Sequence, residues 1–134
     1  MKYRVLLAIV AVAGSAALLS GTAAYAHHSY AATYDTAETI HLEGRLVQFA
    51  LRNPHSYVHI QAPDEDGNIQ RWAVEWSGAG ALNSQGVSRD TLRAGDQIAI
   101  TARPSRVRGE FRALMVTLEA DGLTWGQNPN EVVD

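Results

Sequence analysis

Three of the five histidines in this chain are placed where they could bind one metal ion together. His27 and His28 are adjacent and directly follow Ala26, the end of a stretch of small residues. If the chain is cleaved after Ala26, His27 offers both an N-terminal amine and an imidazole nitrogen to the same ion. A second imidazole, from His28 or His55, would complete a T-shaped site of three nitrogens. Cu(II) favours tetragonal ligation by nitrogen and oxygen, so we expect copper, or else zinc, at such a site.

A carboxylate, Glu75, is expected beside His55. Two strand-like segments, residues 57–62 and 69–76, alternate apolar and polar residues. If their apolar residues share one face, Val58 lies opposite Trp72 and His55 lies opposite Glu75. The carboxylate would then be a direct metal ligand or would orient the imidazole. The alternative is a simple His–Glu hydrogen bond that fixes the strand end, beside an N-terminal tail that binds no metal.

The two remaining histidines are interpreted as solvated side chains. His41 and His59 lie on the outward faces of predicted strands. In the register above, His59 faces Arg71, and the positive charge of this arginine disfavours a bound cation.

An arginine-rich segment, residues 103–112, includes the predicted loop between the last two strands. It contains four arginines and one glutamate: Arg103, Arg106, Arg108, Arg112 and Glu110. In OB-type barrels the corresponding loop borders the usual ligand face, so one interpretation is a site for an anionic ligand or an acidic partner. The other is a solvated hairpin tip that Glu110 partly neutralises.

The first 26 residues have the pattern of a secretory signal peptide. Lys2 and Arg4 precede an apolar run over residues 5–19, and Ala24 and Ala26 form the small-residue cleavage pattern. The run is shorter than the about 20 apolar residues of a membrane span. We therefore expect a cleaved peptide over residues 1–26 and a periplasmic or secreted protein. The alternative is that residues 1–26 remain attached as a membrane anchor.

Composition narrows the partners of the remaining 108 residues. Without Lys2 and Arg4, nine of the 11 basic residues remain against all 14 acidic residues, which gives a net charge of −5. An acidic chain argues against sequence-independent binding of nucleic acid, so we expect no nucleic acid among the partners. The chain has no cysteine, which excludes a disulfide, a thiolate metal site and a lipidated cysteine.

Five strand-like segments are arranged as in a small barrel. Apolar alternation and turn residues predict strands over residues 39–51, 57–62, 69–76, 97–103 and 111–119. The alternation changes phase beside Gly44, which predicts a bulge or bend in the first strand. Short helical stretches are expected within residues 77–95. This order predicts a mainly β fold, a five-stranded OB-like barrel with a helical connection between the third and fourth strands. Another small barrel or an open sandwich is the alternative.

The domain organisation follows from these segments. We expect an extended N-terminal arm over residues 27–38, the barrel over residues 39–120 and a turn-rich tail over residues 121–134. Tyr30 and Tyr34 would lay the arm onto the barrel, and Leu123 and Trp125 would pin the tail. Trp72 and Trp76 are expected in the barrel core.

Residues that would indicate catalysis are missing from the sequence. No serine lies in a nucleophile elbow, and Gly78-Ala79-Gly80 is too short for a phosphate-binding loop. We therefore expect a soluble exported binding or adaptor module for a protein or small-molecule ligand, with no membrane contact after cleavage. The alternative is a periplasmic copper- or zinc-binding module that uses His27, His28 and His55 with Glu75.

Several segments together resemble a family of small exported bacterial proteins with no assigned function. The segments are Ala-His-His-Ser at 26–29, Asn-Pro-His-Ser at 53–56, Trp-Ala-Val-Glu at 72–75, the SRDTLxxGD pattern at 88–96 and Val-Thr-Leu at 116–118. The resemblance implies an exported single domain of OB-like type and brings no catalytic residues with it. The arginine-rich segment 103–112 departs from the family, whose members typically have a shorter loop there.

Overall fold

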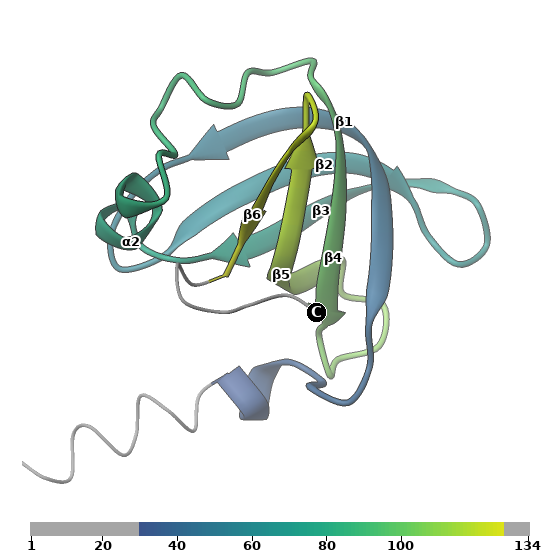
Figure 1. The fold of residues 1–134 in the computed structure, drawn as a ribbon. Coiled ribbons are helices and arrows are strands. Elements are labelled where there is room, and N and C mark those ends of the chain that lie inside the picture. The colour runs from purple at the N-terminus through teal and green to yellow at the C-terminus, as the bar shows by residue number, and fades with distance from the viewer. Residues whose placement is uncertain (1–29, 128–134) are drawn as a thin grey trace, which may run out of the picture. The chain divides into compact units, whose positions relative to one another are not determined.

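Strand β1, Ile40–Ala50, joins the two halves of a β-barrel (Figure 1). The computed structural model describes residues 30–127. The first half of β1 pairs with β4, Gln97–Pro104, and the second half pairs with β2, Ser56–Pro63. At the junction, a Cβ on Gly44 would lie 1.9 Å from the carbonyl oxygen of Gln61. Only glycine allows the two backbones to approach this closely. The bulge or bend predicted beside Gly44 lies further along the strand, where the pairing of β1 with β2 is irregular between Leu46 and Gln48.

Closure of the barrel needs one parallel pairing. Strands β2 and β3, Ile69–Trp76, form one hairpin, and β4 and β5, Arg112–Ala120, form a second. Residues 73–75 of β3 then pair in parallel with residues 112–114 of β5. A short helix, α2 (Ala79–Ser84), lies between β3 and β4 in the chain. The five strands close with OB topology, so the predicted fold is confirmed.

The barrel interior is filled by the inward residues of every strand of the closed barrel. On β3, Trp72, Val74 and Trp76 point inward, and Trp76 is fully buried. Trp72 meets Phe111 edge to face with ring centroids 5.2 Å apart. The prediction that both tryptophans belong to the core is confirmed. Alternate residues of β2 and β3 therefore point out of the barrel, and these outward residues build the candidate site.

Two terminal segments differ from the sequence-based expectations. The tail expected to be turn-rich contains a sixth strand, β6 (Leu123–Gly126), which pairs with the end of β5. At the other end, residues 30–33 are helical rather than extended, and alanines 31 and 32 favour a helix. The chain divides into one unit ending at Thr33 and a second beginning at Tyr34, which contains the barrel.

The expected register of the β2–β3 hairpin is wrong by two positions on one strand. Val58 pairs with Val74 instead of Trp72, and Tyr57 takes the place opposite Glu75. The cause lies in the connecting loop. The Asp64 side chain accepts hydrogen bonds from the backbone N–H groups of Asp66 at 3.0 Å and Asn68 at 2.8 Å. These bonds stabilise a five-residue loop, residues 64–68, and so fix a longer connection than the predicted register requires.

Among residues 30–127, no helix is both long enough and apolar enough to span a membrane.

Candidate functional site

A carboxylate is buried on the outer surface of the barrel. Glu75 lies on β3 between the inward residues Val74 and Trp76, so its side chain points outward. Its exposure is nevertheless only 8%. A buried carboxylate requires hydrogen-bond partners, because the loss of hydration is otherwise too costly. Side chains from two other segments of the chain meet this requirement.

Tyr34 provides the first partner, from the segment that precedes β1. Its hydroxyl donates a hydrogen bond to Glu75 Oε2 at 2.5 Å, and the residue is 1% exposed. Its backbone forms an isolated β-bridge with Ser105, and Asp35 N–H donates to the Pro104 carbonyl at 2.9 Å. Burial, followed by the hydrogen bond to Glu75, raises the pKa of Tyr34 well above its usual value. Tyr34 therefore fastens the segment before β1 onto the barrel, as predicted for this residue.

His55 provides the second partner, from the corner between β1 and β2. Its Nδ1 lies 3.2 Å from Glu75 Oε1. The corner is held by the buried Ser56, whose Oγ donates to the Arg52 carbonyl and accepts from the Arg52 N–H, both at 3.2 Å. Ser56 N–H in turn donates to the Ser77 carbonyl at 3.2 Å. The predicted proximity of His55 and Glu75 is present, although the register that predicted it is not.

Two further side chains surround Glu75, and the sequence-based reasoning did not find them. Tyr57 is the direct cross-strand neighbour of Glu75. Burial and then the charge of Glu75 raise the pKa of Tyr57. The guanidinium carbon of Arg52 lies 5.1 Å from the centre of the Tyr57 ring, in cation–π geometry. The outward phase of Tyr57 in β2 was a usable signal, but the two-position error in register hid its partner.

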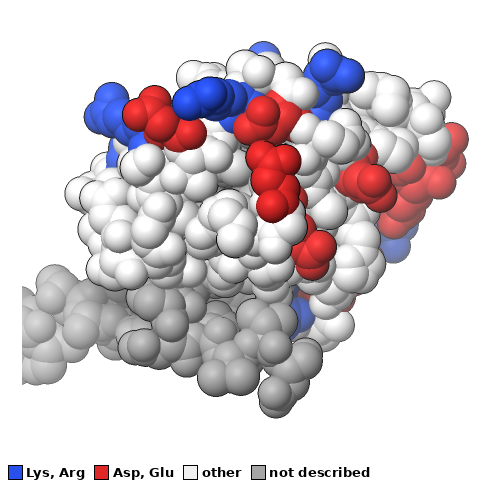
Figure 2. All heavy atoms as spheres, turned by 45° about the horizontal axis from the view of Figure 1, so that its top comes forward, with Lys and Arg blue, Asp and Glu red and all other residues white. Residues whose placement is uncertain are grey.

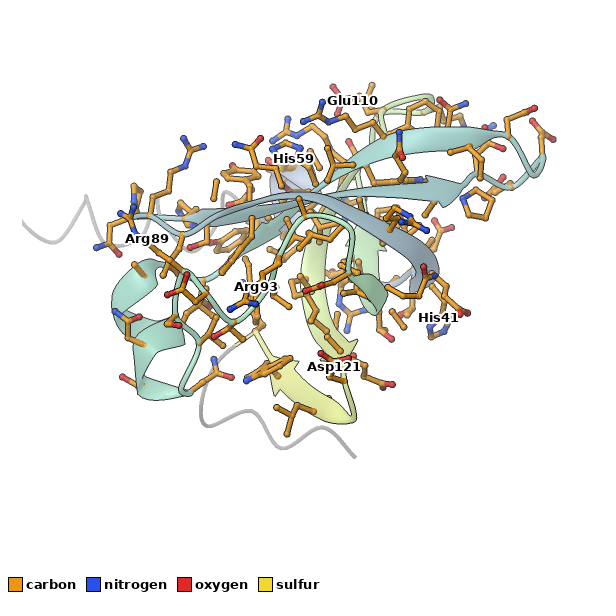
Figure 3. The ribbon with its side chains drawn as sticks, turned by 90° about the horizontal axis from the view of Figure 1, so that it is seen from above. His41, His59, Arg89, Arg93, Glu110 and Asp121 are labelled. Carbon is orange, nitrogen blue, oxygen red and sulfur yellow. The ribbon has the colours of Figure 1, made fainter. Side chains whose placement is uncertain are left out.

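Below Glu75, a row of three outward residues crosses three strands. His59 on β2 pairs with Ala73 on β3, and Ala73 pairs with Arg112 on β5. Arg71 lies two residues from Ala73 on the same face of β3. Burial, then the charges of Arg71 and Arg52, lower the pKa of His59. Figure 3 shows His59 on the same side of the barrel as Glu110 of the β4–β5 loop.

The predicted metal site is only partly within the described residues. His27 and His28 lie outside them, so their position relative to His55 and Glu75 stays a prediction. Within residues 30–127, no group of three or more histidine, aspartate or glutamate side chains could hold a metal ion. Each Glu75 oxygen has a neighbour, Tyr34 for Oε2 and His55 for Oε1. This arrangement fits a carboxylate that orients an imidazole rather than one that binds metal directly.

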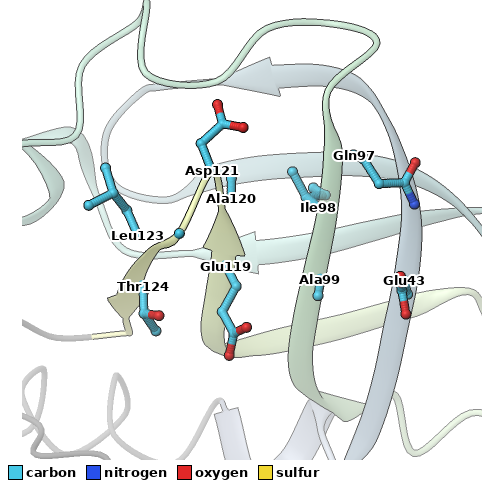
Figure 4. Close-up of a pocket in the computed structure, with 10 residues that line it drawn as sticks. Glu43, Gln97, Ile98, Ala99, Glu119, Ala120, Asp121, Leu123 and Thr124 are labelled. Carbon is cyan, nitrogen blue, oxygen red and sulfur yellow. The ribbon is translucent and has the colours of Figure 1, made fainter.

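A second surface region, formed by β1, β4 and β5, is acidic, whereas the face with His59 and Arg112 is basic. Here Ala99 on β4 lies between Glu43 on β1 and Glu119 on β5. These residues and Asp121 line an open hollow that β6 borders (Figure 4). Figure 2 shows the row of acidic side chains on this side of the molecule. The negative charge of these carboxylates repels an anionic ligand.

The family of this chain follows from its match over residues 16–113. The match is to a family described as "Family of unknown function (DUF6152)". The chain belongs to this family. The match includes Tyr34, His55 and Glu75, so the Glu75 cluster lies within the matched region. A search of curated proteins found no match.

Two solved structures are similar to this chain in fold. Both are crystal structures of the mitochondrial single-stranded DNA-binding protein Rim1 from S. cerevisiae, one of them selenomethionine-labelled. The first has a TM-score of 0.47 and 11% identity and covers 63% of this chain and 94% of its own. The second has a TM-score of 0.46 and 13% identity, with coverages of 62% and 92%.

These neighbours correct one expectation. The exclusion of nucleic acid from the partners was wrong, because both similar structures are single-stranded DNA-binding proteins. The exclusion relied on the overall net charge expected for residues 27–134. Net charge does not describe how charge is distributed, and this barrel separates an arginine-bearing face from an acidic one.

Proposed function

We propose that this protein is an exported binding module whose ligand site is the outer face of β2 and β3, beside Glu75. The observation that carries the proposal is the buried carboxylate of Glu75, held on the barrel exterior by Tyr34 and His55 from two distant segments. The barrel interior is filled without this cluster. A buried polar network outside the core costs more to assemble than solvated side chains, which supports a role in holding a binding surface in shape.

The loops around this face support the same assignment. In OB barrels, ligands bind at the β2–β3 face between the β1–β2 and β4–β5 loops. Here the β1–β2 corner carries Arg52 and His55, and the β4–β5 loop carries Arg106 and Arg108. This is support by analogy of fold, and the charged side chains add the chemical part of the argument.

Export is the second part of the proposal. The positive start, the apolar run and the small-residue pattern support cleavage after Ala26 and release into the periplasm or outside the cell. Intact mass spectrometry of the protein from fractionated source cells tests this part. The expected mass corresponds to residues 27–134 in the exported fraction. A full-length mass in the membrane fraction would contradict it and would support a retained anchor.

Site-specific photo-crosslinking tests the location of the ligand face. A benzophenone amino acid replaces Gln61, an exposed outward residue of β2, or Thr124, an exposed residue of β6 that serves as the matched control. Irradiation of intact source cells is expected to give a mass-shifted adduct from position 61 and none from position 124. An adduct from position 124 alone, equal adducts from both positions or none from either would contradict the proposal.

A copper- or zinc-binding module is the second candidate, and the His55–Glu75 contact favours it. When Nδ1–H of His55 donates to Glu75 Oε1, the ring is fixed in the tautomer whose lone pair is on Nε2. This is the arrangement of a carboxylate that orients a metal-binding histidine. His27 is seven residues from Tyr34, and because residues 30–33 are helical this segment reaches at most about 16 Å. The covalent connection therefore leaves His27 or His28 able to join His55 if the segment folds back toward the β1–β2 corner.

Titration with Cu(II) and Zn(II) tests this candidate. Mature protein beginning at His27 is expected to bind one equivalent tightly. One additional glycine before His27 moves the terminal amine away from the imidazole and is expected to weaken binding at least tenfold. His55→Gln is expected to do the same, whereas His41→Gln is the matched control. Equal affinities for all four proteins, or no tight binding by the first, would remove this candidate.

A further inference from the structure

The row formed by His59, Ala73 and Arg112 has the chemistry of an anion site. It runs across β2, β3 and β5 on the outer face of the barrel. The middle residue is alanine, whose short side chain leaves a shallow depression between the longer side chains of its two neighbours. Arg71 continues the row along β3 in the same outward phase. A small group above Ala73 would therefore meet hydrogen-bond donors from three directions.

The arginines around this row carry charge that the described residues do not neutralise by ion pairing. Within residues 30–127, Arg52, Arg71 and Arg112 form no ion pair with a carboxylate, unlike Arg106, which pairs with Asp35. Arg112 is a cation at any physiological pH, and its neighbours Tyr34, which also hydrogen-bonds it, and Glu110 raise its pKa further.

The nearby carboxylates already have hydrogen-bond partners, although the charge of Glu110 also acts on Arg112. Glu75 is held by Tyr34 and His55, and Glu110 Oε2 accepts a hydrogen bond from Ser105 Oγ at 2.7 Å. The positive charge of the arginines also affects His59. Burial lowers the pKa of His59 most, and the charges of Arg71 and Arg52 lower it further. A face with several guanidinium groups attracts anions and holds planar or tetrahedral oxyanions by paired N–H donors.

We propose that Arg71, Arg112 and His59 bind an oxyanion group, a phosphate or a carboxylate, of a small ligand above Ala73. This inference rests on the proposed function, because it names the ligand chemistry of the same face. The guanidinium groups of Arg71 and Arg112 donate to the oxyanion from β3 and β5. His59 donates one ring N–H from β2, which the neutral imidazole can do. Arg52, stacked on Tyr57, adds long-range attraction.

Calorimetric titration of the mature protein with inorganic phosphate and, separately, with succinate tests the inference at low ionic strength. These two probes distinguish the two sources of the oxyanion. Binding of either probe is expected to weaken about tenfold in Arg71→Gln and in Arg112→Gln, the loss typical of one charged hydrogen bond. Arg89→Gln is the matched control, since Arg89 is exposed and lies away from His59 (Figure 3), and its affinity is expected to change less than twofold.

Two further variants keep the test decisive. Arg112→Lys retains the charge but loses the paired donors, and an intermediate affinity is expected. Ala73→Leu fills the space above position 73 with a larger side chain. This variant is expected to abolish binding although the arginines remain. Failure of both probes to bind, or equal binding by all variants, would overturn the oxyanion assignment. If crosslinking from position 61 still succeeded, only the ligand class would be wrong, whereas loss of that crosslink would remove the proposed function itself.

Discussion

Two rows of three residues, each centred on an alanine, give the two sides of this barrel opposite chemistry. His59, Ala73 and Arg112 cross β2, β3 and β5. Glu43, Ala99 and Glu119 cross β1, β4 and β5. The two rows share a backbone plan, so the difference lies in the flanking side chains and in what surrounds them.

The surroundings explain why we place the ligand at the first row. On the side of His59 and Arg112, the carboxylate of Glu75 is buried in a network with Tyr34 and His55. Beside Glu43 and Glu119, the hollow adds a third carboxylate, Asp121. An ordered network of neighbouring side chains holds the first region in one geometry, and the second is an acidic surface open to water. The comparison teaches that the more hollow region of a small barrel need not be the better prepared binding surface.

The largest effect is expected at Gly44, where β1 passes from one region to the other. Gly44→Ala places a Cβ against the carbonyl oxygen of Gln61, at 1.9 Å in the unrelaxed structure. Backbone must move on both sides of the junction, and we expect a loss of about 3 kcal/mol in the free energy of unfolding. Urea denaturation measures it. Gly80→Ala, in α2 with open space around it, is expected to leave stability unchanged or increase it by up to about 1 kcal/mol.

Removing one carboxylate from each region separates the network from the open surface. Glu75→Ala leaves the buried Tyr34 hydroxyl without its acceptor and is expected to cost about 2.5 kcal/mol. Glu119→Ala changes an exposed residue and is expected to stay within about 0.5 kcal/mol of the wild type. Equal losses in the two variants would show that the two regions do not differ as described. The measurement is again urea denaturation, with circular dichroism as a check on folding.

A smaller effect is expected when only one bond of the network is removed. Tyr34→Phe keeps the buried ring but loses the hydrogen bond to Glu75, at a cost of about 1.5 kcal/mol at pH 7. The folded state raises the pKa of Tyr34, so the unfolded chain ionises first. The contribution is therefore complete below pH about 10 and declines as the pH rises further. The stability difference between wild type and variant should shrink in alkaline solution, and a constant difference would contradict the assignment.

The smallest effect is expected at His59. Because the folded state lowers the pKa of His59, the unfolded chain takes up a proton first as the pH falls. Stability should therefore decline as the pH falls below about 6.5. His59→Gln is expected to remove this part of the decline, which thermal unfolding between pH 7 and pH 5 measures. Arg71→Gln removes one cause of the lowered pKa of His59 and is expected to reduce the loss of stability at low pH. A larger loss of stability in this variant would contradict a cationic face.

Much of the fold could be predicted because its signals are local. Alternating apolar residues located all five barrel strands, and the phase change beside Gly44 indicated an irregularity in β1, which lies between Leu46 and Gln48. The candidate site could be predicted only in part, because it depends on register. The hydrogen bonds of Asp64 lengthen the β2–β3 loop, and so Tyr57 rather than His55 lies opposite Glu75. Tyr34 lies 41 positions from Glu75 in the sequence, and no periodicity connects two residues so far apart.

The most direct test of the central claim is to observe where an anion binds. Inorganic phosphate is titrated into isotope-labelled mature protein at low ionic strength, and the backbone amide signals are followed by nuclear magnetic resonance. We expect saturable shifts centred on His59, Ala73 and Arg112, with Ala99 and Glu119 unchanged. Shifts centred on Ala99 and Glu119, or the absence of saturable shifts anywhere, would contradict the account.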